Sequence, residues 1–78
     1  MDEVVFKSWE PGFRKVSLTK MLQREAGLSL SEAKEKTDWL LEGKTVTVRF
    51  SSRHRAQEVS DAARQIGVIA EVRSSRPV

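Results

Sequence analysis

The residues that could carry catalytic or metal chemistry are few in this chain, and their spacing suits none of the common sites. His54 is the single histidine and there is no cysteine, which excludes Cys–His nucleophiles and thiolate zinc sites. His54 lies too close in sequence to Ser51 and Ser52 to form a triad with either. The carboxylates of the predicted helices have the spacing of ordinary surface charges: Glu32, Glu35, Asp38, Glu58 and Asp61. We therefore expect no enzyme, no catalytic or metal site and no cofactor.

The basic segment 51–55 (Ser-Ser-Arg-His-Arg) offers another kind of chemistry, because it begins a predicted helix. Free backbone donors at a helix N-terminus bind anions, and arginines there would add to the attraction for phosphate. One interpretation is an anion-binding site made of Ser52, Arg53 and Arg55 that contacts phosphate or RNA. The other is a solvated basic turn. Few aromatic residues accompany these charges, which argues against base stacking.

Val16 breaks the polar pattern of its predicted helix face. At about 100° per residue it falls opposite the apolar stripe that contains Leu18 and Leu22, and beside Lys20 and Gln23. An apolar side chain within a basic rim is typical of an interaction anchor. The alternative is an ordinary surface valine near a helix start.

The elements that must position these residues follow from periodicity and from turn signals. Strands are predicted at 4–6, 44–50 and 68–73, of which 44–50 alternates strictly between polar and apolar residues. Helices are predicted at 14–26, from a Ser29–Glu32 capping box to about 40, and from a Ser51–Ser52 cap to about 66. Gly27 is expected to end the first helix. We expect a flexible tail at 74–78.

This order predicts one α/β (α+β) domain over residues 1–73, a two-layer sandwich with the sequence β-α-α-β-α-β. The first strand is expected between the other two and antiparallel to both, with three helices on one face of the three-stranded sheet. The second and third strands should then run parallel to each other. The spacings place these residues in one core: Leu18, Leu22, Val46, Val48, Phe50, Ala63 and Ile66.

The composition is that of a water-soluble globular domain, with 38% hydrophobic and 32% charged residues in a chain of 78. No apolar run approaches membrane-spanning length, and the first residues lack the pattern of a signal peptide. We therefore expect a cytoplasmic protein that has no contact with membranes. The formal charge of +3 allows an acidic protein or a nucleic acid as partner. The sequence leaves the oligomeric state open.

The stretches 15–22 (Lys-Val-Ser-Leu-Thr-Lys-Met-Leu) and 26–34 (Ala-Gly-Leu-Ser-Leu-Ser-Glu-Ala-Lys) resemble the C-terminal domain of the stalk protein of the bacterial large ribosomal subunit. The resemblance implies the fold predicted above and a partner surface on the outer face of the first two helices. Val16, Lys20 and Lys34 match that surface. Thr19 and Gln23 stand where the family usually has a larger apolar residue and an arginine. A translation factor or a ribosomal component is the partner that the resemblance implies.

A second family that shares the fold is the adaptor of the Clp protease, which reads the N-terminal residues of its substrates. In that family the pocket uses an Asn-Asp pair after the first strand and a histidine. Here the loop is Ser8-Trp9-Glu10-Pro11-Gly12, and His54 lies in the third helix. A Clp-adaptor-like protein is therefore the last alternative, after the interaction module and the phosphate-contacting or RNA-contacting protein.

Overall fold

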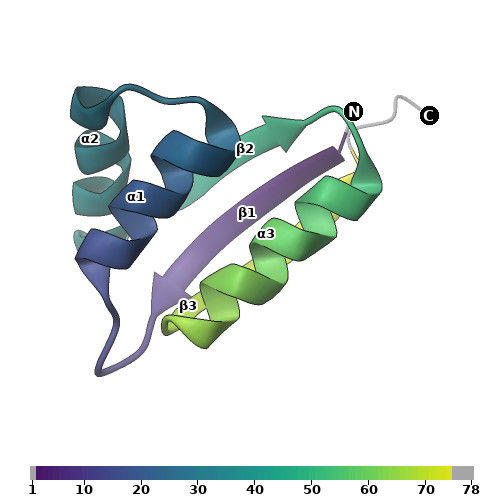
Figure 1. The fold of residues 1–78 in the computed structure, drawn as a ribbon. Coiled ribbons are helices and arrows are strands. Elements are labelled where there is room, and N and C mark those ends of the chain that lie inside the picture. The colour runs from purple at the N-terminus through teal and green to yellow at the C-terminus, as the bar shows by residue number, and fades with distance from the viewer. Residues whose placement is uncertain (1, 75–78) are drawn as a thin grey trace.

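Three strands and three helices follow one another in the predicted order in the computed structural model of the chain, which describes residues 2–74 (Figure 1). The strands are β1 (Asp2–Trp9), β2 (Val46–Phe50) and β3 (Val68–Ser74). The helices are α1 (Lys15–Ala26), α2 (Leu30–Leu41) and α3 (Arg53–Gln65). The predicted fold class, a small α+β domain, is confirmed.

The strand boundaries differ from the prediction at four places. β1 is longer than predicted at both ends, whereas β2 begins two residues later, at Val46. Ser74, which was expected in a flexible tail, is the last residue of β3 and pairs with Asp2. The rest of the predicted tail, residues 75–78, lies outside the described residues.

The sheet has the strand order β2-β1-β3, with β1 antiparallel to both neighbours as expected. β2 and β3 consequently share one direction on either side of β1. The helices cover one face of the sheet (Figure 1). A register shift between Phe6 and Ser8 gives β1 one extra residue opposite β3, and pairing then continues to Trp9.

The core lies between the sheet and the helices, and the predicted set is found there. Leu18, Leu22, Val46, Phe50 and Ala63 are buried, while Val48 and Ile66 are partly buried against them. Thr45 and Thr47 are exposed, which confirms the predicted register of β2. Val4 and Phe6 from β1 and Val68 from β3 complete the sheet side of the core.

The open face of the sheet is covered by ion pairs. Val5 points away from the helices yet is only 5% exposed, because its cross-strand neighbours Thr47 and Glu71 flank it. The Glu71 carboxylate lies 3.1 Å from Lys7 Nζ and 2.9 Å from Arg73 Nη2. Hydrogen bonds from Lys7 and then from Arg73 lower the pKa of Glu71.

The start of α1 is held in place by the turn between α3 and β3. The Glu10 amide donates to the Gly67 carbonyl at 2.9 Å, and the Arg14 amide donates to the Ile66 carbonyl at 3.1 Å. Gly67 has φ +90°, and a Cβ there would lie 3.0 Å from Phe13 Cα. Glycine thus allows the loop before α1 to approach closely, which fixes the direction of the first helical turn.

The joint between α1 and α2 is set by local signals that the sequence contains. Gly27 adopts the left-handed conformation, with φ 68°, and ends α1 as expected. The predicted capping box is present, because the Ser29 side chain accepts from the Glu32 amide while the Glu32 carboxylate accepts from the Ser29 amide. A hydrogen bond from the Ser29 amide, and after it one from the Ser29 side chain, lower the pKa of the Glu32 carboxyl.

Candidate functional site

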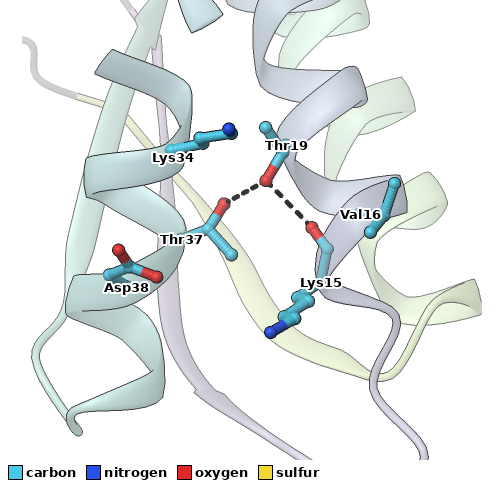
Figure 2. Close-up of a pocket in the computed structure, with 6 residues that line it drawn as sticks. All are labelled: Lys15, Val16, Thr19, Lys34, Thr37 and Asp38. Carbon is cyan, nitrogen blue, oxygen red and sulfur yellow. Dashed lines mark hydrogen bonds between the residues drawn. The ribbon is translucent and has the colours of Figure 1, made fainter. Parts of the chain in front are cut away.

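A shallow cleft separates the outer faces of α1 and α2 (Figure 2). Its volume is about 180 Å³. Its lining residues come from both helices: Lys15, Val16 and Thr19 of α1, and Lys34, Thr37 and Asp38 of α2. The start of α1 faces the end of α2, since Lys15 and Asp38 line the same cleft. The helices therefore form an antiparallel hairpin with the cleft along its seam.

Two threonine hydroxyls connect the helices at this seam. Thr19 Oγ1 lies 3.0 Å from Thr37 Oγ1, 18 residues away in sequence (Figure 2). Thr19 Oγ1 also lies 3.0 Å from the Lys15 carbonyl, and Thr37 Oγ1 lies 2.9 Å from the Ala33 carbonyl. Both threonines are buried, at 9% and 2% exposure, so these contacts replace hydration.

Val16 stands at one end of the cleft with 62% of its surface exposed. Leu30, in the first turn of α2, is 50% exposed. Because the helices run antiparallel, the two apolar side chains belong to opposite ends of the helix pair. Each side chain exposes apolar surface to water, and a partner could bury that surface.

The charges around the cleft are mainly positive. Lys15 and Lys34 face one carboxylate, that of Asp38. Within residues 2–74 neither lysine has an acidic group within ion-pair distance. The cleft can therefore attract an acidic group from another molecule without first breaking an internal salt bridge.

The structure brings together only part of the predicted partner surface. Val16, Thr19 and Lys34 line the same cleft. Lys20 instead lines a groove on the opposite flank of α1, where α3 is the neighbour. Gln23 is half-buried on α1.

Three residues that line the cleft are not among the predicted site residues: Lys15, Thr37 and Asp38. Thr37 lies on the inner stripe of α2 with Ala33 and Leu40, so its spacing alone predicts a core position. Asp38 was treated as a surface charge. Both lie three to four residues after Lys34, so the helical repeat already placed them on one side of α2.

The predicted anion site at the start of α3 has its charges partly matched by carboxylates. Ser52 is the N-cap, and its hydroxyl accepts from the Arg55 amide at 3.1 Å. Arg55 Nη2 lies 3.5 Å from the Glu25 carboxylate, and His54 Nε2 lies 3.5 Å from Glu58. Arg53 is exposed. An anion bound here would compete with these carboxylates for the same cations.

Residues 2–74 contain no group of three or more histidine or acidic side chains that could hold a metal ion. In the same range no helix has the length and apolar character needed to cross a membrane. The molecule is thus a small α+β domain with a basic, partly apolar cleft between two helices. Comparisons with models of protein families and with curated proteins find no match.

Proposed function

We propose that this chain is a non-enzymatic protein-interaction module that binds its partner at the outer face of α1 and α2. The observation that carries the proposal is the exposure of Val16 beside a cleft with unpaired lysines. A small apolar anchor within a basic rim suits an acidic protein surface that offers an apolar pocket or side chain. Lys20 and Gln23 would contact such a partner from the solvent-facing side of α1.

The proposed partner is a translation-factor GTPase or a ribosomal component. Support comes from the resemblance of residues 15–34 to the stalk C-terminal domain, since Val16 and Lys34 of the matching surface share one cleft. The test asks whether a surface that differs from the family at Thr19 and Gln23 still binds such a partner. A hydroxyl at position 19 makes the floor of the cleft more polar than an apolar residue would.

The experiment measures affinity for purified bacterial translation-factor GTPases by calorimetry, with Val16→Asp as the first variant. We expect a loss of about 2 kcal/mol of binding free energy, or about 30-fold in Kd. Folding should change by less than about 0.5 kcal/mol, because the site is exposed and an acidic residue in the first turn of α1 favours the helix dipole.

The matched control is Ile69→Asp, which introduces the same charge at an exposed apolar residue on the open face of the sheet. Lys34→Glu should mainly slow association and change its salt dependence. Equal affinity for the wild-type chain, Val16→Asp and Lys34→Glu would exclude this surface. A Val16→Asp chain that does not fold would show that Val16 belongs to the core.

Anion binding by Ser52, Arg53 and Arg55 stays a second prediction, supported by the exposure of the α3 start. Titration with inorganic phosphate or a short RNA at low ionic strength should shift the amide signals of residues 52–55. We expect the shifts to grow in a Glu25→Gln variant, because Arg55 then loses its carboxylate neighbour. Unchanged amide signals in both chains would leave only a solvated basic turn.

A further inference from the structure

A groove runs along the flank of α1 that faces α3, away from the cleft with α2. Two adjoining hollows form it, with volumes of about 320 and 190 Å³, and they share Met21, Arg24 and Ala62. Met21 is 4% exposed and forms part of the floor together with Ile66, which is half-buried. The larger hollow begins at Ser17, near the start of α1.

One end of the groove is bridged and the other is open. Glu25 on α1 and Arg55 on α3 approach within 3.5 Å, so an ion pair spans the two helices at the end of α1. Glu25 also accepts from Arg24 Nε at 3.2 Å. Within residues 2–74 no ion pair joins α1 and α3 at the opposite end.

The larger hollow has only cations among its charged lining residues, Lys20 and Arg24. The smaller hollow is lined by Glu25 and Glu58 as well as Arg24, so the cationic part of the groove is the larger hollow alone. Lys20 forms no ion pair with any described residue, and only the Nε group of Arg24 has a protein acceptor among them. A guanidinium has five N–H donors, so the outer edge of Arg24 can still bind a carboxylate through two parallel hydrogen bonds.

We infer that the larger hollow of this groove is a second docking surface, which takes an acidic segment of a partner protein with an apolar side chain. The carboxylates would meet Lys20 and Arg24, and the apolar side chain would cover Met21 and Ile66. The larger hollow follows α1 from Ser17 to Arg24, eight residues or about 12 Å, which matches two turns of a helix. None of its lining residues is aromatic, so it offers no stacking surface for bases. This surface is distinct from the proposed cleft with α2.

The test is a titration of the isotopically labelled full chain with a synthetic peptide that carries leucine between glutamates. A matched peptide has every glutamate replaced by glutamine. The charge variant is Lys20→Glu with Arg24→Glu. The control is Lys36→Glu with Lys44→Glu, which changes the net charge equally at two lysines beside Trp39, outside every proposed site. Ala62→Met fills the floor without changing any charge.

We expect the acidic peptide to shift the amide signals of Ser17, Lys20, Arg24 and Gln65. The charge variant and Ala62→Met should each weaken binding by at least about tenfold, whereas the control should bind like the wild-type chain. The glutamine peptide should bind more weakly than the acidic one.

Four results would overturn the inference. They are the absence of shifts at these positions at millimolar peptide, shifts confined to Lys34 and Thr37, an equal loss of binding in the control, and stronger binding of a short RNA than of the peptide at the same amides. Shifts at Lys34 and Thr37 would support the cleft with α2 and reject the groove, so the two surfaces can fail independently.

Discussion

The hydroxyl pair of Thr19 and Thr37 allows a quantitative test, because the number of protons limits the number of hydrogen bonds. Three short contacts involve the two hydroxyls, at 3.0, 3.0 and 2.9 Å. Each hydroxyl has one proton, so at most two of the contacts are hydrogen bonds at any moment. Two unprotonated oxygens facing each other at 3.0 Å in a dry site would repel. One hydroxyl therefore donates across the seam while the other donates to its own helix.

The perturbation is a double-mutant cycle with Thr19→Val and Thr37→Val. In each single variant the remaining hydroxyl returns its proton to its own carbonyl, so one hydrogen bond of about 1 kcal/mol is lost. Burial of the added methyl group offsets up to about 0.8 kcal/mol. The net cost of each single change is then about 0.2 kcal/mol, the double variant costs about 0.4 kcal/mol, and the coupling energy is near zero.

The alternative is that all three contacts act as full hydrogen bonds. Each single variant would then lose two bonds and cost about 1.2 kcal/mol, and the double variant would lose three and cost about 1.4 kcal/mol. The coupling energy would be about −1 kcal/mol. Urea unfolding followed by the fluorescence of Trp39, which packs partly buried against the core, measures all four chains. A coupling energy near −1 kcal/mol would refute the proton count.

Two further predictions concern stability. Gly67→Ala should cost more unfolding free energy than Gly43→Ala, because the two glycines have φ +90° and +89° but only Gly67 has Phe13 within contact of a new Cβ. The backbone strain alone should cost about 1–3 kcal/mol in both variants. Equal urea midpoints would show that Phe13 moves away from the new Cβ without cost. The lowered pKa of Glu71, caused first by Lys7, stabilises the fold above the ordinary carboxyl pKa of about 4.3, and this contribution is lost as the pH falls through the lowered value. Glu71→Gln should therefore flatten the acid side of the stability-versus-pH curve, and an unchanged slope would contradict the assigned ion pair.

Periodicity predicted most of the fold because each element buries one side. Val46 and Phe50 are buried while Thr47 between them is exposed, which is the alternation read from the sequence. The far end of β1 could not be read in this way. Lys7 and Ser8 are polar and exposed. Lys7 is the extra residue at the register shift and Ser8 pairs with Ile69, so both belong to the strand only because β3 lies beside them. Such pairing is a tertiary interaction that local propensity does not contain.

The sequence predicts a site residue that departs from the polar pattern of its own helix face. It does not predict a contact that forms only where two helices pack together. Val16 is exposed at 62%, as its position opposite the apolar stripe predicts. Thr37 follows the apolar stripe of α2, so its spacing alone indicates core. Its contact with Thr19 depends on how α1 and α2 are packed, and the hydroxyls become a pair only once the hairpin forms.

The neighbours of Lys20 likewise depend on helix packing, and they decide which hollow Lys20 belongs to. Four residues after Val16, it lies about 40° further around α1, which explains why the sequence places both on one outer face. α1, however, has α2 on one flank and α3 on the other, and that angle brings Lys20 to the groove with α3. One helix thus contributes a wall to two different hollows.

A loss of binding on Lys20→Glu alone would report on the groove, whereas losses on Val16→Asp and Lys34→Glu together would report on the cleft. Two partners bound in the two hollows would contact each other over the solvent-facing side of α1, so the binding of one should weaken the binding of the other.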